Sequence, residues 1–347
     1  MHRLTAGRAI LEHELSELRL LVERQTGVLL DCPNSALAAH VSEFLEKWEL
    51  DSANALFDRL RSSEADPAVL QEFLSGVINT NTGFFRHPGA MGALAHHVLP
   101  QLYPRKSSEG PGSLRIWSVG CGTGEEAYSI AMTLCDPVSL CATTSRGQVN
   151  GNGNGNGNGG KSGAAKTGGI AENSLPSSFP MAKDWSVHIV GTDLLPSAVE
   201  TAERGIYPQS ALEGLPPAAI RSCFTKISCT SGVPGRNGSS ETSSGGCHLL
   251  VKPRLRSMVT FNTMNLIEPV YIGRFDCIFC MDLLPHLSRP HRVALMERLH
   301  LYLEPGGYLF LSQTEKLCSS NLNFRAETFD GYTVYRKPLA ASAAYGR

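Results

Sequence analysis

The sequence lacks any apolar stretch that approaches the length of a membrane-spanning helix. After Met1 to Arg8, the N-terminal residues alternate apolar with acidic side chains, so they lack the unbroken apolar core of a signal peptide. Together, these absences predict a cytoplasmic protein without membrane insertion.

The chain also lacks an excess of charge of either sign. Lys and Arg number 31 against 32 Asp and Glu, which gives a formal net charge of -1 over 347 residues. Strong binding to nucleic acid needs several positive contacts with phosphate, and no basic stripe is present. We therefore expect no nucleic-acid partner.

Regular cysteine spacing is absent as well. The ten cysteines are scattered, which indicates reduced thiols rather than a disulfide framework. Cys277 and Cys280 match a CxxC pattern, but they lie in the apolar run 275–281, which is typical of a buried strand. Positions i and i+3 of a strand point to opposite faces, and no second Cys or His pair completes a zinc site. We interpret the pair as part of the core and expect no metal.

Helical patterns dominate the first part of the chain. Apolar residues from Ile10 to Val22 recur with the spacing of one helix face. Asp51 can cap a second helix, and Asp66 precedes Pro67, which is favoured at the first position of a helix. Residues 1–90 therefore predict a small helical domain and a linker.

From residue 114 onward, short apolar runs alternate with helical segments, which is typical of a mostly parallel sheet with crossover helices. We predict an α/β domain over residues 91–340. Its expected strands lie near 114–119, 187–192, 275–281, 308–312 and 332–336, and its expected helices near 125–135, 196–204 and 289–303.

Two low-complexity segments interrupt this pattern. Residues 141–180 contain an Asn/Gly run and almost no large apolar side chains, which predicts a disordered insertion. Residues 229–247 are rich in Ser and Gly and predict a flexible loop. The loop falls within 206–262, where 249–251 and 258–261 could supply the strands of a small β-subdomain.

The strongest local pattern is a strand, a glycine turn and a helix. The expected strand at 114–119 runs into Gly120-Cys-Gly-Thr-Gly124, and glycines let the backbone turn tightly and approach a ligand. A phosphate group would favour a helix start free of acid. Here the helix begins with Glu125 and Glu126, whose carboxylates suit a cationic ligand with an α-amino group and a sulfonium. The pattern thus favours S-adenosylmethionine over a dinucleotide, held by Gly120, Gly122, Gly124, Glu125 and Glu126.

The second expected strand ends at Asp193, beside the glycine turn. An acid at this position usually holds a ribose diol. The separation from Gly124 exceeds the usual roughly 20 residues, and the insertion at 141–180 accounts for most of the excess. The alternative is that Asp193 caps the following helix through Ser197.

These motifs occur together with others in a fixed order. They are 79–86, 120–132, 191–193, 202–207, 265–266, 275–280, 303–307 and 333–337. In this order they resemble the chemoreceptor glutamate methyltransferases (CheR-type) over nearly the whole chain. The resemblance implies a Rossmann-like class I S-adenosylmethionine-dependent methyltransferase domain preceded by a small all-α domain. It further implies a monomer whose protein acceptor is the cytoplasmic domain of a chemoreceptor.

The resemblance also implies residue roles. In the linker, Thr82 and Arg86 approach the cofactor, and Thr80 takes the place of a family asparagine. The acidic helix start at Glu125 and Glu126 holds the amino acid part of the cofactor.

Further along the chain, the resemblance implies that Asp193 holds the ribose and that Asn265 and Leu266 lie by the adenine. It places Met281 and Asp282 near the methionine end.

The chain departs from the family pattern after residue 280. The family usually continues with Arg-Asn and has a tyrosine four residues further on, whereas this chain has Met281, Asp282 and His286. His286 could act as a new catalytic acid or base, or it could be a partly exposed loop histidine beside Pro285.

A glutamate side chain is ionised near neutral pH and can attack a sulfonium methyl without a general base. Catalysis then depends on positioning and desolvation, and Arg86 suits the alignment of an incoming carboxylate. Two alternatives remain. The substitutions after residue 280 favour a non-catalytic S-adenosylmethionine-binding or scaffold module. The net acidic stretch 35–61, which is basic in the family, favours a different acceptor.

Overall fold

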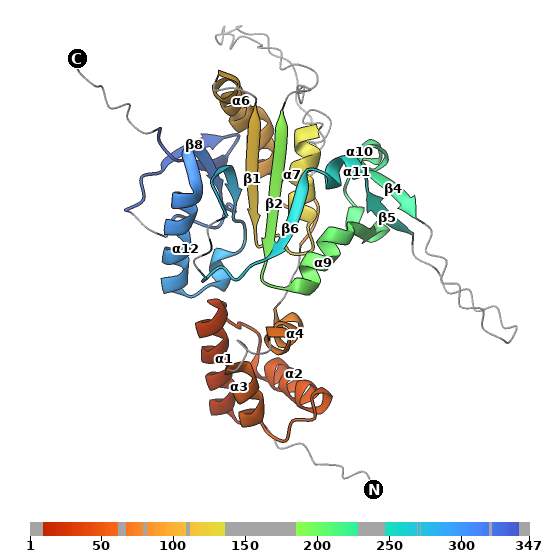
Figure 1. Ribbon diagram of the computed structural model, residues 1–347, viewed down its shortest axis with the longest axis vertical. Helices are drawn as coiled ribbons and strands as arrows, with labels where there is room; N and C mark the ends of the chain where they lie inside the picture. The colour runs from red at the N-terminus through yellow and green to blue at the C-terminus, as the bar shows by residue number, and fades with distance from the viewer. Residues whose placement is uncertain are drawn as a thin grey trace, which may run out of the picture.

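The computed structural model describes residues 10–61, 67–78, 82–108, 112–135, 185–227, 247–268, 270, 272–318 and 321–339. Within them, a helical unit lies next to a larger unit built on a central sheet (Figure 1). The predicted insertion at 141–180, and all of the predicted loop at 229–247 except its last residue, lie outside the described residues.

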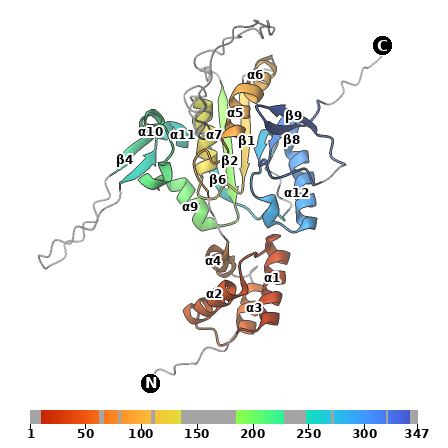
Figure 2. The same cartoon turned by 180° about the vertical axis from the view of Figure 1, so that it is seen from behind.

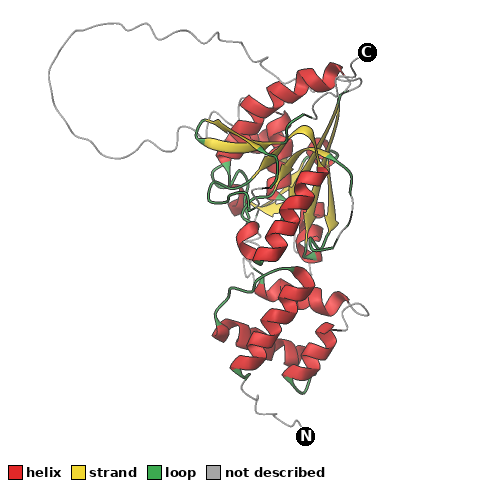
Figure 3. Ribbon diagram, turned by 90° about the vertical axis from the view of Figure 1, so that its left-hand side faces the viewer, coloured by secondary structure: helices red, strands yellow, loops and turns green. Residues whose placement is uncertain are grey.

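The N-terminal unit consists of helices packed around one apolar core (Figure 3). Its helices are α1 (Glu12–Thr26), α2 (Asn34–Lys47), α3 (Ala53–Arg61) and α4 (Pro67–Val77). Each helix contributes fully buried side chains to this core, among them Leu18, Leu37, Leu56 and Phe73. The hydroxyl of Ser52, rather than the predicted Asp51, accepts a backbone N–H at the start of α3, and Asp66 lies outside the described residues.

The central sheet confirms the predicted α/β, Rossmann-like fold. Its strand order is β6-β2-β1-β7-β8-β10-β9. The pairs from β6 to β8 are parallel, whereas β10 runs antiparallel to both of its neighbours. The bounds are β1 (Ser113–Val119), β2 (Ser186–Asp193), β6 (Val259–Thr263), β7 (Phe275–Phe279), β8 (Leu303–Phe310), β9 (Arg325–Phe329) and β10 (Tyr332–Arg336).

Helices cover both faces of this sheet (Figure 2), because consecutive residues of its strands are apolar and point to opposite faces. In β1, Ile116 belongs to a core shared with α5, α6 and α7, and Trp117 belongs to a core shared with α12. The helices are α5 (Pro88–Ala93), the π-helix η1 (Leu94–Val98), α6 (Leu99–Ser108), α7 (Glu125–Cys135), α9 (Pro196–Arg204) and α12 (Arg289–Tyr302).

The predicted β-subdomain differs from expectation in one strand. Residues 258–261 are expected in it, but β6 pairs in parallel with β2 in the central sheet. Phe261 of β6 is buried against the ring of Tyr128 in α7, which favours this placement. The subdomain sheet has the antiparallel order β3-β5-β4. Its elements are β3 (Ile206–Pro208), the 3-10 helix η2 (Gln209–Leu212), α10 (Pro217–Cys223), β4 (Phe224–Ile227), β5 (His248–Val251) and α11 (Pro253–Arg256).

The CxxC pair belongs to the core, as predicted. Both thiols are fully buried, Cys277 in one core of the sheet and Cys280 in the other. Burial raises the pKa of each thiol well above its usual range. Separately, no helix among the described residues is long and apolar enough to cross a membrane.

The two units meet along a short backbone seam. Val28 forms an antiparallel bridge with Leu287, just after the 3-10 helix η3 (Leu284–His286). The N–H of Leu29 donates to the carbonyl of His286 at 2.8 Å, and the N–H of Ser288 donates to the carbonyl of Gly27 at 3.1 Å. These bonds fix the α1–α2 connection against the sheet unit.

Gly27 tests the packing of this seam. It has a φ of +74°, and an added Cβ would lie 2.6 Å from Cγ2 of Ile267. We expect Gly27→Ala to lower the free energy of unfolding by about 1–2 kcal/mol for left-handed backbone and by about 1–3 kcal/mol more for overpacking. Urea denaturation measures both contributions together.

Gly331→Ala is the matched control, because Gly331 has a φ of +78° and an added Cβ there would have no heavy atom within 4 Å. The control should show only the backbone cost. An equal loss of stability in the two variants would contradict close packing at the seam.

Candidate active site

A cavity of about 320 Å³ lies between the helical unit and the carboxyl ends of the parallel strands. Its walls come from the α1–α2 connection at 26–31, the linker at 82–87, the glycine turn and the segment after β7. The volume lies in the range of small-molecule sites, and the carboxyl edge of a parallel sheet is where such folds bind ligands.

The glycine turn and Asp193 are joined directly. The N–H of Gly122, at a φ of +54°, donates to Oδ2 of Asp193 at 2.9 Å, and the N–H of Leu195 donates to Oδ1 at 3.0 Å. Burial raises the pKa of this carboxyl, and the backbone bonds oppose the increase. The alternative, that Asp193 caps the following helix through Ser197, does not match the structure: among the described residues, no side chain forms a capping hydrogen bond at the start of α9. Asp193 therefore lies at the cavity edge with both oxygens fixed.

Gly124 and Glu125 lie at the turn but outside the cavity lining, whereas Gly120 and Gly122 line it. An added Cβ at Gly124 would be 2.7 Å from the Cβ of Ala202, so this glycine permits the close approach of α7 and α9. Burial raises the pKa of Glu125, and the hydroxyl of Thr123 donates to its carboxylate.

Glu126 brings a partly buried carboxylate to the cavity. The hydroxyl of Ser118 donates to its Oε1 at 2.6 Å, and no Lys or Arg in the described part of the chain forms an ion pair with it. Burial, with smaller contributions from Asp282 and Glu315, raises its pKa to about 7. A cationic ligand would supply the missing positive charge.

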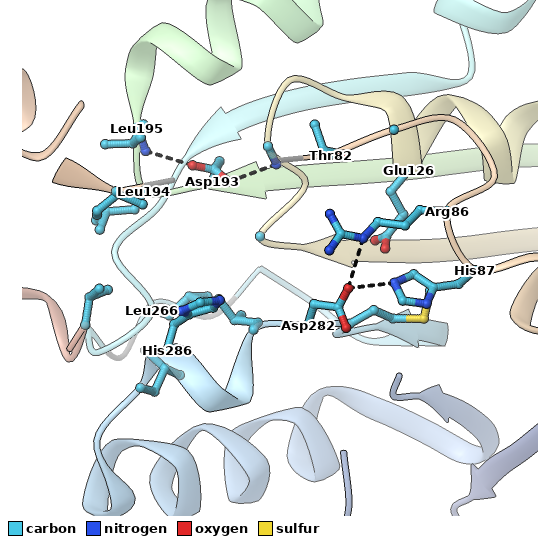
Figure 4. Close-up of a pocket in the computed structure, with 18 of the residues that line it drawn as sticks. Thr82, Arg86, His87, Glu126, Asp193, Leu194, Leu195, Leu266, Asp282 and His286 are labelled. Atoms are coloured by element: carbon cyan, nitrogen blue, oxygen red, sulfur yellow. Dashed lines mark hydrogen bonds and ion pairs between the residues drawn. The ribbon is translucent and has the colours of Figure 1, made fainter. Parts of the chain in front are cut away.

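Arg86, His87 and Asp282 form a charged group on the cavity wall (Figure 4). Oδ2 of Asp282 lies 3.2 Å from Nε of Arg86 and 2.9 Å from Nε2 of His87. Asp282 has a φ of 56°, in the left-handed region. Sequence reasoning missed His87, although its position directly after Arg86 in the linker motif was a usable signal.

Met281 lies beneath this group and lines the cavity. The hydroxyl of Tyr332 is 3.5 Å from its Sδ and donates to the carbonyl of Leu311 at 2.5 Å. Burial raises the pKa of Tyr332 above its usual range, so this phenol stays a hydrogen-bond donor. Met281 is therefore held in the cavity wall by contact with Tyr332.

The structure separates the two predicted catalytic residues. His286 lines the cavity at the end near Leu266, away from Arg86 (Figure 4). Its side chain is half exposed, and its Nδ1 lies 3.9 Å from Oδ2 of Asp31. This geometry matches the alternative of a partly exposed histidine at the seam.

The remaining predicted residues fall into three groups. Leu266 and Thr82 line the cavity. Asn265 is not among the lining residues, because its amide donates to the carbonyl of Gln25 at 2.8 Å and so joins the two units. Thr80 lies outside the described residues.

Comparison with known proteins agrees with this geometry. The family model described as "CheR methyltransferase, SAM binding domain" matches residues 80–147 and 171–332. The chain therefore has a class I S-adenosylmethionine-dependent methyltransferase domain, and S-adenosylmethionine is its cofactor. It belongs to the CheR methyltransferase family.

Curated relatives extend over most of the chain. A "Probable chemotaxis protein methyltransferase" of Rhizobium etli is 27% identical over 280 residues, covering 80% of this chain and 82% of that protein. "Chemotaxis protein methyltransferase 1" of Pseudomonas aeruginosa is 27% identical over 324 residues, covering 89% and 96%. A solved N-methyltransferase NodS from Bradyrhizobium japonicum, in complex with S-adenosylhomocysteine, covers 69% of this chain and 85% of its own at 10% identity. Its TM-score of 0.29 is too low to add to the family assignment.

The residues of the cavity fit S-adenosylmethionine. The partly buried acid Glu126 has no cationic partner among the described side chains, and the cofactor carries an amino group and a sulfonium. The exposed backbone of Gly120 and the carboxylate of Asp193 line the same cavity, which suits a ribose.

Asp193→Ala tests the ribose assignment. Loss of a charged hydrogen-bonding partner should weaken binding of S-adenosylhomocysteine about 10- to 100-fold, measured by isothermal titration. Asp276→Ala is the control, since Asp276 is a buried carboxylate at the opposite end of the sheet that accepts the N–H of Arg115. Unchanged affinity in Asp193→Ala would remove Asp193 from the cofactor site.

The raised pKa of Glu126 predicts that both fold stability and ligand affinity depend on pH. Its pKa of about 7 lies above the ordinary 4.5, so its protonated form stabilises the fold. That contribution is complete below about pH 4.5 and is lost as the pH rises through about 7. The positive α-amino group of S-adenosylhomocysteine prefers the ionised form of Glu126, so affinity for this ligand should rise about tenfold from about pH 6 to about pH 8. Glu126→Gln should flatten this profile, and parallel profiles for both proteins would contradict the assignment.

Proposed function

We propose that this chain transfers the methyl group of S-adenosylmethionine to a glutamate carboxylate of a chemoreceptor-like protein. The observation that carries the proposal is that one cavity is lined both by Glu126, a carboxylate that no described Lys or Arg pairs with, and by the half-exposed Arg86. The acid suits the cationic cofactor, and the arginine suits an incoming carboxylate. The names of the curated relatives point to the same signalling system.

In this proposal, different residues of the cavity lining bind different parts of the cofactor. Asp193 holds the ribose, Leu266 lies by the adenine, and Glu126 faces the amino acid end of the cofactor. Met281 and Asp282 form the wall near the methionine end. The assignment is supported by the fact that each of these residues lines one cavity.

In methyl transfer to a carboxylate, the main contribution of the protein is to position the two reacting groups. The bound cofactor supplies an electrophilic methyl group, and a glutamate is already ionised near neutral pH, so no general base is required. Arg86 orients the acceptor carboxylate, and Asp282 fixes the guanidinium through Nε at 3.2 Å. Entry of the acceptor would expel water from the cavity, which strengthens these interactions.

In this proposal, the surface of the acceptor around its glutamate is not strongly acidic. The basic residues of 35–61 are already engaged: Lys47 pairs with Glu72, Arg61 pairs with Glu17, and Arg59 lies 5.3 Å over the ring of Trp48. The surface left by the acids of α2 and α3 repels an acidic partner. We therefore propose a cytoplasmic acceptor with few acids around its glutamate, met by a monomer of this chain.

A second candidate is a cofactor-binding module without turnover. It is favoured by the carboxylate of Asp282, which lies between Arg86 and His87 and offsets their charge where an acceptor carboxylate would enter. Binding of S-adenosylmethionine without methyl transfer to any receptor fragment would support this candidate.

Arg86→Ala tests the transferase proposal. Loss of the guanidinium should lower kcat/KM for transfer of a radiolabelled methyl group to a chemoreceptor cytoplasmic fragment about 10- to 100-fold. Stability should change little, because the side chain is half exposed. The measurement pairs this assay with thermal unfolding.

Arg86→Lys is the matched variant, since it keeps the charge but loses the planar fork, and its loss should be intermediate. A variant that unfolds, or that transfers methyl groups at the normal rate, would contradict the role of Arg86.

A further inference from the structure

A buried carboxylate outside the cavity lining holds the segment that carries Asp282. Glu315 follows β8 and is 7% exposed. Its Oε2 accepts the N–H of Asp282 at 3.0 Å and that of Ser312 at 2.9 Å. Its Oε1 accepts the N–H of Leu284 at 2.9 Å. Both oxygens therefore serve backbone donors from two loops that are far apart in sequence.

The segment held in this way forms one wall of the cavity. Asp282 has a left-handed φ of 56° and directs its carboxylate to Arg86 and His87. Leu283 packs against the glycine turn, with its Cδ1 3.3 Å from the position of an added Cβ on Gly120. A change in the backbone at 282–284 would move both the charged group and the turn.

We propose that Glu315 is a positioning residue of the methyltransferase site. It acts on the cofactor through the backbone of 282–284, because it does not line the cavity itself. The converging N–H groups require an acceptor at both oxygens, and an amide would place a donor against a donor at one of them. Among the described residues no Lys or Arg pairs with Glu315, so these backbone bonds compensate for the burial of its charge.

Asp276 provides a matched comparison within the same sheet. It is 1% exposed, its Oδ2 accepts the N–H of Arg115 at 2.9 Å, and its Oδ1 lies 2.9 Å from Nζ of Lys106. Asp276 lies near the amino end of β7, whereas Glu315 holds the segment that follows the carboxyl end of β7. A purely structural carboxylate and a positioning carboxylate can therefore be separated by experiment.

The test compares Glu315→Gln with Asp276→Asn in the full chain. Isothermal titration with S-adenosylhomocysteine, thermal unfolding and amide hydrogen exchange over 281–287 are measured for each. We expect Glu315→Gln to raise the Kd about tenfold and to speed exchange at Asp282 and Leu284. Asp276→Asn should lower Tm with the Kd unchanged. An unchanged Kd in Glu315→Gln, or an equal rise in both variants, overturns the proposal.

The inference rests on the cofactor cavity proposed above and not on the acceptor. If Asp193→Ala weakens binding and Glu315→Gln does not, only the positioning role fails. If neither variant weakens binding, the cavity assignment fails as well. Should Glu315→Gln not fold, exchange in the unmodified chain decides: slow exchange at Asp282 and Leu284 supports the proposal, and exchange at the rate of unbonded loop amides overturns it.

Discussion

Buried loop N–H groups must find acceptors, and at the carboxyl edge of this sheet carboxylates serve that need. Asp193 accepts the N–H groups of Gly122 and Leu195, and Glu315 accepts those of Asp282, Ser312 and Leu284. Asp193 itself lines the cavity, and Glu315 holds a segment that lines it. The carboxylates that accept loop N–H groups therefore determine both the geometry of the loops and the charge near the cavity.

This arrangement determines which ligand the cavity accepts. Burial raises the pKa of Glu126 to about 7, and the neighbouring Asp282 and Glu315 add to the increase. A cofactor with positive charge relieves this repulsion, whereas a pyrophosphate would increase it. Arg86 lines the same cavity as Glu126, so the cavity offers both a positive and a negative group to its ligands.

Sequence reasoning succeeded where the signal was local. A strand, a glycine turn and an acidic helix start are contiguous, so the turn at Gly120 and the position of α7 could be predicted directly. It failed for β6, because a short strand does not specify its partner, and β6 pairs with β2 instead of joining the subdomain. Glu315 was also out of reach, since it lies 33 residues from Asp282 and its function depends on accepting backbone N–H groups.

The three departures from the family pattern have unequal consequences. Met281 remains an apolar wall supported by Tyr332, so its effect is on shape. His286 lies at the seam, where its carbonyl accepts the N–H of Leu29, so its effect is on contact between the two units. Asp282 alone adds a charge beside Arg86, and its left-handed backbone is held by Glu315. Of the three, residue 282 therefore changes the charge of the cavity most.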